Sequence, residues 1–307
     1  MKRRMTAGLG LIAGLALALV PTGLATPGAA GAGADRTTSS AGSNISRHAA
    51  ATTRAEQKRI QDYWTPARMK SAIPVGQKVD PQKGKPGGGT SGGTAVAETP
   101  QPQFGKVFFT EGNSNYVCSG TATTSSNQSV VTTAGHCVNE GPGAYVTNFA
   151  FYPAYNNGAS SLGVWTARTL LTSTGWKNSG DYNVDVGFAV MNTNGGRTLT
   201  SVTGSYTPVF NAPRGASMKA WGYPAARPFN GQTLYSCTGT VVQDTYGGST
   251  DQGLACNMTG GSSGGGWIQD GQLASVTSFG YTGIKNILWG PYFGTVIQDV
   301  YTAASTS

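Results

Sequence analysis

A single histidine is available for chemistry in the greater part of this chain. The sequence of 307 residues contains two histidines, and His48 lies in a basic first third whose composition differs from that of the remaining residues. His136 lies in VTTAGHC (residues 131–137), where a β-favouring run leads into small residues. A lone histidine is often structural. As the only imidazole of its region, however, His136 must carry any proton transfer there that uses imidazole.

A serine flanked by glycines lies far downstream, in TGGSSGGGW (residues 259–267). Glycine lets the backbone turn sharply, and such a turn can aim several N–H groups at one point. That arrangement stabilises the oxyanion that forms when a hydroxyl attacks a carbonyl. Ser262 and Ser263 are adjacent, but only Ser263 is followed directly by two glycines, so Ser263 is the candidate nucleophile.

A carboxylate that could orient the imidazole lies between these two motifs. Asp185 heads the apolar run DVGFAVM, and a buried aspartate is unfavourable unless it is hydrogen-bonded. Holding an imidazole would give it a partner. Asp181 is the competing candidate, but its context NSGD is typical of an exposed turn. We therefore prefer Asp185.

Charge divides the chain into two parts. Residues 1–105 hold thirteen Lys and Arg against five Asp and Glu, whereas residues 106–307 hold eight of each. The net charge of +8 therefore belongs to the first third, and the neutral remainder lacks the basic face that a nucleic-acid-binding protein needs. Two histidines cannot build a His-rich metal site. We expect no catalytic metal and no cofactor, and the sequence leaves open a structural ion such as calcium.

The first third is typical of export and processing. Three basic residues precede an apolar run over residues 7–20, and AGA at 32–34 fits a signal-peptidase site, which predicts a signal peptide over 1–34 and a secreted protein. An uncleaved anchor is the alternative, and no later run is long enough to span a membrane. Residues 35–104 are interpreted as a propeptide with a Gly-rich linker, the alternative being an arm that stays attached. Residues 56–73 predict a short helix interrupted by Pro66.

Residues 105–307 predict one β-rich domain. Short β-favouring runs recur between Gly, Asn, Ser and Thr turns, which favours an antiparallel sandwich or a pair of barrels. These runs are 107–110, 116–123, 129–133, 145–152, 186–191, 218–223, 234–242 and 273–279. Residues 291–304 have near-helical apolar spacing and predict a C-terminal helix.

Four cysteines lie in this domain, and an even number behind a signal peptide indicates disulfides. Three pairings are possible. The pairing that is local in sequence joins Cys118 to Cys137 and Cys237 to Cys256, with the same separation in both bridges. Each bridge would contribute ~3 kcal/mol to stability through loop-closure entropy.

Together these motifs resemble those of secreted bacterial members of the chymotrypsin-like serine protease family. TAGHC matches the family's histidine motif, GSSGG its nucleophile motif and DVGFAV its aspartate strand, in the family's order His, Asp, Ser. The resemblance covers roughly residues 105–305 and implies an all-β fold of two antiparallel six-stranded β-barrels with a C-terminal helix. The implied activity is peptide-bond hydrolysis through an acyl-enzyme.

The resemblance also implies a role for each residue of the site. Ser263 would attack the scissile carbonyl, His136 would take the serine proton and return it to the leaving amine, and Asp185 would hold the imidazole. The N–H groups of Gly261 and Ser263 would form the oxyanion hole. Substrate would pair with the strand that contains Ser278, Phe279 and Gly280.

Further features of the family map less completely. The bridge Cys118–Cys137 matches the family's histidine-loop disulfide, and Cys237–Cys256 is a weaker match. Ser262 replaces the acid that receives a freed N-terminus in animal relatives, so we expect propeptide removal to unblock the cleft instead. The base of the substrate pocket would lie near Asn257 and Met258, where no acid or histidine is present. By elimination, the residue before the cleaved bond is neutral and apolar.

Other classes fit less well. An α/β-hydrolase needs a histidine after its serine, and none is found after Ser263; subtilisin order needs an aspartate before the histidine within the domain. The remaining alternative is a catalytically silent binding module on the protease scaffold. The expected partners are a protein or peptide substrate and the chain's own propeptide. We expect a monomer that binds no nucleic acid and, once the signal peptide is removed, no membrane.

Overall fold

The computed structural model describes residues 44–82 and 93–307. The predicted signal peptide, its cleavage site and most of the Gly-rich linker lie outside the described residues. Those that are described belong to one compact unit. No helix in this part of the chain is long and apolar enough to cross a membrane.

The first half of the domain is a closed barrel of six antiparallel strands. In the order β9–β10–β7–β6–β5–β8 each strand pairs with the next, and β8 pairs with β9 to close the ring. The strands are β5 (Phe104–Glu111), β6 (Ser114–Thr123), β7 (Val130–Thr133), β8 (Thr147–Pro153), β9 (Trp165–Ser173) and β10 (Gly187–Met191). Their buried face is rich in Val and Phe, which suit a pleated and packed surface.

The second half is built from two five-stranded sheets. One has the order β16–β15–β11–β12–β4 and the other β13–β14–β18–β17–β3. The strands of the first sheet are β4 (Val96–Glu98), β11 (Ser217–Gly222), β12 (Leu234–Thr240), β15 (Gly266–Gln269) and β16 (Gln272–Val276). Those of the second are β3 (Gln77–Val79), β13 (Val242–Gln243), β14 (Gln252–Ala255), β17 (Phe279–Tyr281) and β18 (Ile287–Gly290). The predicted β-barrel fold is confirmed, with the first barrel closed and the second half divided between two sheets.

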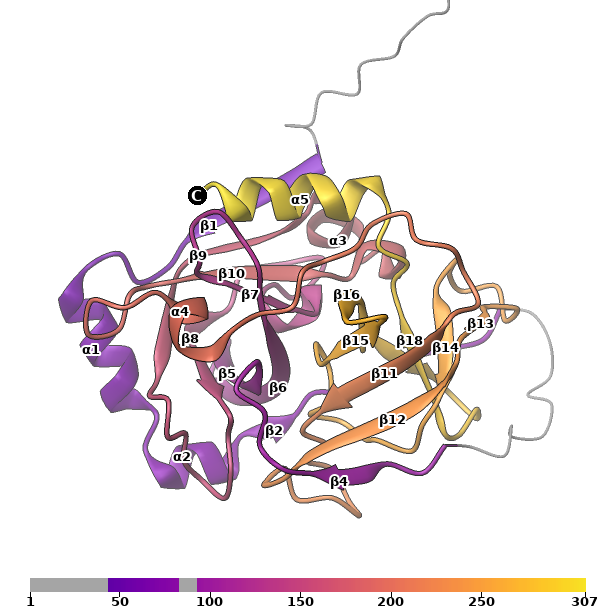
Figure 1. Cartoon of the computed structure of the whole chain (residues 1–307), viewed down its shortest axis with the longest axis horizontal. Helices are drawn as coiled ribbons and strands as arrows, with labels where there is room; N and C mark the ends of the chain where they lie inside the picture. The colour runs from indigo at the N-terminus through magenta and orange to yellow at the C-terminus, as the bar shows by residue number, and fades with distance from the viewer. Residues whose placement is uncertain (1–43, 83–92) are drawn as a thin grey trace, which may run out of the picture. The chain divides into compact units, whose positions relative to one another are not determined.

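Short helices connect and cover the strands. The C-terminal helix α5 (Thr295–Ser305) packs on β9 and β10, as Figure 1 shows, and buries Ile297 and Val300 in a core shared with Phe188. The remaining helical segments of the domain are η2 (Gly135–Cys137), α3 (Thr174–Ser179), η3 (Tyr182–Val184) and α4 (Leu199–Thr203). The predicted C-terminal helix is therefore present and begins four residues later than expected.

The segment upstream of the linker packs on the first barrel. Strand β1 (Ile45–Ala49) pairs with β9 along its whole length, and the predicted helix is two helices, α1 (Arg54–Tyr63) and α2 (Pro66–Ser71). The break falls at Trp64 and Thr65 because Pro66 can begin a helix but cannot continue one. Ile60 and Trp64 are buried against the barrel. The short strand β2 (Ile73–Pro74) comes after α2 and lies beside β6.

Both disulfides have the sequence-local pairing. Cys118 is bonded to Cys137 and Cys237 to Cys256, each across a separation of 19 residues. The first bridge joins β6 to η2 in the first barrel, and the second joins β12 to the loop after β14. Residues 93–98 also belong to the packed structure, since β4 pairs with β12 and Glu98 forms an ion pair with Lys219. The predicted domain start at residue 105 stays a prediction.

Candidate active site

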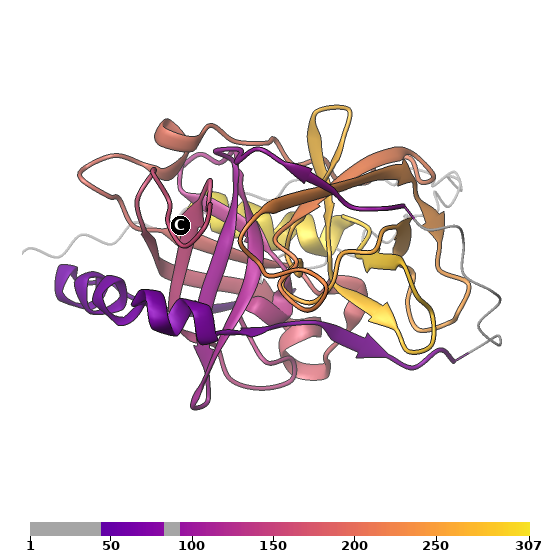
Figure 2. The same ribbon diagram turned by 90° about the horizontal axis from the view of Figure 1, so that it is seen from below.

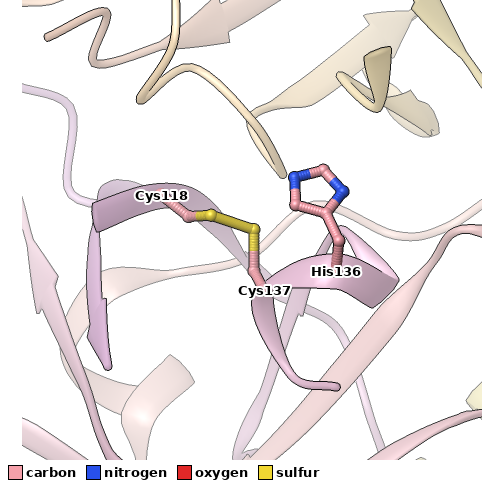
Figure 3. Close-up of side chains that lie close together, drawn as sticks. All are labelled: Cys118, His136 and Cys137. Atoms are coloured by element: carbon pink, nitrogen blue, oxygen red, sulfur yellow. A yellow bond between two sulfur atoms is a disulfide. The ribbon is translucent and has the colours of Figure 1, made fainter. Parts of the chain in front are cut away.

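The imidazole of His136 is fixed by a turn and a disulfide. Strand β7 ends at Thr133, and the chain then closes the single turn η2, in which His136 and Cys137 are both buried. A ring nitrogen of His136 and the two sulfurs of the Cys118–Cys137 bridge all lie within 4.8 Å of one another. Figure 3 shows the ring standing beside the disulfide. The ring therefore lies next to β6, from which Cys118 comes.

Asp185 holds this histidine through two hydrogen bonds. Its Oδ2 lies 2.8 Å from His136 Nδ1, and its Oδ1 accepts a bond of 2.8 Å from the His136 backbone N–H. Both side chains are almost wholly buried. A Cβ on residue 135 would lie 2.8 Å from Asp185 Oδ1. Gly135, which has no side chain, therefore leaves room for the carboxylate. The carboxylate thus fixes the position of the turn as well as that of the ring.

A third donor completes the environment of Asp185. Ser278 Oγ donates to Asp185 Oδ2 at 2.5 Å, and Ser278 is itself buried. The backbone N–H of Ser278 donates to the carbonyl of Trp289 on β18, so the serine is anchored where the chain passes from β16 to β17. Asp181, the competing acid, instead caps η3 by accepting from the N–H of Asn183.

The negative charge of Asp185 also raises the pKa values of neighbouring groups. Burial, aided by the negative Asp185 nearby, raises the pKa of the Tyr182 hydroxyl. Burial, followed by repulsion from the same carboxylate as the second-largest cause, raises the pKa of Asp251 well above its usual range. Asp251 is fully buried and its carboxylate oxygens have no hydrogen-bond partner in the described part of the chain. Burial and repulsion therefore both favour its protonated form.

Ser263 lies in a turn made by glycines in the left-handed region. Gly261 has a φ of 97° and Gly264 a φ of 78°, values that a residue with a Cβ rarely adopts. A Cβ on Gly264 would meet the backbone N of Ala134, which places the serine loop against the histidine loop. Ser262 turns inward, where its Oγ donates to the carbonyl of Thr259. Ser262 is therefore held in the loop by a hydrogen bond and not by an ion pair.

The hydroxyl of Ser263 contacts a segment that the sequence did not connect to the site. Ser263 Oγ donates to the carbonyl of Val75 at 3.2 Å, and the N–H of Gly261 donates to the same oxygen at 2.6 Å. His136 Nε2 is buried and has no hydrogen-bond partner in the residues described. The structure therefore has no hydrogen bond between Ser263 and His136 in the described residues, and the Ser263 hydroxyl is bonded to Val75 instead. No local pattern around Val75 indicates this contact.

A pocket of about 450 Å³ opens beside the serine. Its wall includes the predicted residues Asn257, Met258, Ser278, Phe279 and Gly280, together with Ser263. Residues that the sequence analysis did not single out complete it, chiefly Thr259, Ala226 and the stretch from Ile284 to Leu288. The lining contains no Asp, Glu or His; its charged members are Lys78 and Lys285. Asn257 Oδ1 faces the chain upstream of the domain, since it accepts from the N–H of Ala95.

One cluster of possible metal ligands lies in the described residues, and its chemistry does not fit a metal centre. Cys118, His136 and Cys137 are the only group of three His, Cys, Asp or Glu in the described residues whose ligand atoms come close together. Both cysteines share a disulfide, so neither offers the thiolate that a metal would need.

Fold and site together define a protein of the serine endopeptidase class, with chymotrypsin-like architecture. The family model "Trypsin" matches residues 90–298. Since that match spans more than half of the sequence, the chain belongs to the trypsin family.

Solved structures of similar proteins agree with this assignment. The protease Anisep from Arthrobacter nicotinovorans is 53% identical, with a TM-score of 0.68 over 69% of this chain and 100% of its own. The thermostable serine protease AL20 from an extremophilic microorganism is 48% identical, with a TM-score of 0.65 over 67% of this chain and 98% of its own. A Glu endopeptidase is 22% identical, with a TM-score of 0.58 over 71% of this chain and 99% of its own, which shows the shared fold alone.

A curated relative matches a shorter region. The extracellular metalloprotease of Bacillus subtilis (strain 168) is 28% identical over 145 residues, which are 44% of this chain and 44% of that protein. The chain thus spans less than half the length of this relative.

Proposed function

We propose that this chain is the precursor of a secreted serine endopeptidase that hydrolyses peptide bonds through Ser263, His136 and Asp185. The observation that carries the proposal is the position of the Val75 carbonyl. A peptide carbonyl lies against the Ser263 hydroxyl and accepts the N–H of Gly261. A scissile carbonyl needs this same position, in which its oxygen accepts hydrogen bonds from the backbone N–H donors and its carbon lies beside the nucleophile.

The proposed reaction is set by the atoms around this carbonyl. Ser263 Oγ attacks the carbonyl carbon as His136 Nε2 takes its proton, and the resulting oxyanion is stabilised by the N–H groups of Gly261 and Ser263. The imidazolium then protonates the leaving amine, and water reverses the sequence to release the acid. Asp185 stabilises the imidazolium because its carboxylate already contacts Nδ1 at 2.8 Å. Loss of one N–H donor would slow the reaction by about 10²–10³-fold.

The pocket supports a preference for a neutral, apolar residue before the cleaved bond. Met258, Phe279, Ile284, Ile287 and Leu288 supply its apolar lining. It has no carboxylate to pair with a substrate Lys or Arg and no histidine to pair with a substrate Glu; Lys285 is the one charged residue of its wall outside the proposed propeptide. Digestion of a peptide library checks this preference, and strong cleavage after arginine or after glutamate would contradict it.

Residues 35–104 are proposed to act as a propeptide that is removed after export. Nearly a third of this chain has no counterpart in Anisep, since 69% of the chain covers all of that structure. The Anisep comparison and the separate basic composition of residues 1–105 both support this division. The active form is proposed to be a monomer that takes protein or peptide substrates.

Labelling with a fluorophosphonate tests the proposed chemistry directly, because only an activated serine reacts with it. The protein isolated from culture medium should be labelled at Ser263, and the Ser263→Ala variant should not. A catalytically silent binding module would stay unlabelled in both forms. Labelling at a serine other than Ser263 would also refute the assignment.

A further inference from the structure

Residues 73–79 cross the cleft as an extended strand that pairs with both halves of the domain. Figure 2 shows this stretch leaving α2 and running along the molecule to β3. Ile73 and Pro74 pair in parallel with Tyr116 and Val117 of β6. Gln77–Val79 pair in parallel with β17. Between these two pairings, the carbonyl oxygen of Val75 accepts hydrogen bonds from the N–H of Gly261 and from the hydroxyl of Ser263.

The position of His136 fixes the direction in which a cleavable chain must run. The atom that comes after a scissile carbonyl carbon is the leaving nitrogen, and it must face the imidazole that protonates it. The ring of His136 lies beside the Cys118–Cys137 disulfide, on the side of β6. A substrate therefore places the residues after the scissile bond along β6. The residues before that bond lie along β17 and the pocket.

The observed segment runs the other way. Ile73 and Pro74 precede the carbonyl of Val75 and pair with β6, whereas Gln77–Val79 come after it and pair with β17. The Cα of Gly260 would be 3.2 Å from a Cβ on Gly76, so Gly76 passes directly over the serine loop. A chain running in the substrate direction would be antiparallel to β6 and β17, but this segment is parallel to both.

The reversed direction separates the carbonyl from the proton donor. The oxygen of Val75 occupies the position of a substrate oxygen, yet the amide after it leads toward the pocket. His136 Nε2 makes no hydrogen bond to this amide or to any other described group. Attack at Val75 would thus give an intermediate whose amine cannot take a proton from the imidazole, and the intermediate would return to the intact peptide.

We propose that residues 73–79 are a reversed-strand inhibitor, which occupies the catalytic cleft of the precursor without being cleaved at Val75–Gly76. This inference rests on the proposed endopeptidase function and specifies how the propeptide regulates it. The partner that fits the closed cleft is an extended peptide whose chain direction is opposite to that of a substrate.

The inhibitor is anchored at both ends. Upstream, Ile60, Trp64 and Met69 of the α1–α2 region are buried in a core shared with the barrel. Downstream, the carbonyl of Val79 accepts from the N–H of Thr282 at 2.9 Å. A cut after residue 82 leaves every one of these contacts intact. Activation therefore requires that residues 44–82 also dissociate or be degraded.

Displacing the strand in the full-length chain tests the proposal. In the Gly76→Val variant the added side chain meets the backbone of Gly260, which lifts the strand from the serine loop. Fluorophosphonate labelling is read only in the band of full-length mass. We expect the variant to be labelled at least about fivefold faster than the wild-type precursor, since overpacking of this kind costs about 1–3 kcal/mol and 1 kcal/mol corresponds to about fivefold. Ala55→Val, at an exposed position of α1, is the matched control and should label at the wild-type rate.

A synthetic peptide of residues 72–82 tests the direction without any variant. Added to the active enzyme from culture medium, it should inhibit hydrolysis competitively and remain intact by mass spectrometry. Cleavage between Val75 and Gly76 would overturn the reversed orientation. Equally fast labelling of the wild-type precursor and the processed enzyme would overturn the inhibition while leaving the proposed function standing. Absence of labelling in every form, processed enzyme included, would overturn the proposed function and this inference with it.

Discussion

Ser278 donates its hydroxyl hydrogen to the same oxygen of Asp185 that contacts His136. The serine also begins the turn into β17, the strand that lines the pocket and pairs with residues 77–79. One buried hydroxyl therefore joins the peptide-binding strand to the carboxylate that orients the imidazole. Its effect on catalysis passes through Asp185, which makes Ser278 a positioning residue.

Removing this hydroxyl should lower turnover more than substrate affinity. In Ser278→Ala the carboxylate loses a charge-assisted hydrogen bond, which is worth about 1.5–3 kcal/mol. We expect kcat to fall at least about tenfold, with KM changed little, because the pocket wall keeps its shape. Ser278→Thr retains a hydroxyl and should recover part of the activity. Steady-state kinetics on a peptide substrate measure both constants.

Ser275→Ala is the matched control for this variant. Ser275 is another buried serine, but its hydroxyl donates to the carbonyl of Pro291 and does not reach the site. Its loss should lower the free energy of unfolding by ~1 kcal/mol and leave kcat near the wild-type value. Equal losses of kcat in the two variants would show that Ser278 acts only through general stability.

Replacing the carboxylate itself distinguishes the two candidate acids. Asp185→Asn keeps the shape of the side chain but stabilises the wrong tautomer of the imidazole, and kcat should fall by about 10⁴-fold. Asp181→Asn should leave kcat close to that of the wild type, since Asp181 contacts Asn183 and not the imidazole. A larger loss in Asp181→Asn than in Asp185→Asn would reverse the assignment. Circular dichroism confirms that both variants fold.

The sequence predicted the parts of the molecule that have local signals. Strand runs, the paired cysteines and the turn around His136 are encoded in neighbouring residues, and the structure contains all three. The predicted strand 273–279 is instead two strands that belong to different sheets. It breaks where Thr277 bonds back to Gly265 and Ser278 bonds across to Trp289. Such a change of sheet depends on distant partners, and a run of β-favouring residues does not reveal it.

No pattern in neighbouring residues predicts the contact between Val75 and the serine loop. The two segments are 188 residues apart, and β2 and β3 are too short to show a period. Their parallel partners, β6 and β17, are distant in sequence and belong to different halves of the domain. Composition therefore led to the prediction of a propeptide, but it gave no indication that residues 73–79 lie against the serine loop. Strand β9 was also missed, because threonines and Arg168 interrupt its apolar pattern.

A buried lysine should give this chain an unusual dependence of stability on pH. Lys106 is 3% exposed, its Nζ donates to the carbonyl of Gly231, and burial lowers its pKa to about 7. In the unfolded chain a lysine titrates near ~10.4. Between these values the unfolded state binds more protons, so this lysine makes the free energy of unfolding rise with pH. Its contribution to the slope of the unfolding free energy against pH reaches at most about 1.4 kcal/mol per pH unit. Below about pH 7 the lysine is protonated in both states, and it no longer contributes to the slope.

Lys106→Met should remove this contribution. The measurement is denaturant unfolding from about pH 7 to about pH 10, the interval between the folded and unfolded pKa values, in the Ser263→Ala background, which prevents autolysis. The slope of the unfolding free energy against pH should be smaller in the variant than in the parent. Lys70→Met, at an exposed position of α2, should keep the parent slope. An unchanged slope in Lys106→Met would mean that Lys106 stays protonated in the fold.

The two disulfides offer a test that separates stability from chemistry. Both close the same separation of 19 residues, so replacing either pair by serines should lower the free energy of unfolding by the same ~3 kcal/mol. Their surroundings differ, because the Cys118–Cys137 bridge lies against the ring of His136 whereas Cys256 lines the pocket. Loss of the first bridge should therefore lower kcat, and loss of the second should raise KM. Kinetics below the melting temperature of both variants compare the two effects. If kcat fell and KM rose by the same factors in both variants, the two bridges would contribute only to stability. The Cys118–Cys137 bridge would then not hold the imidazole in place.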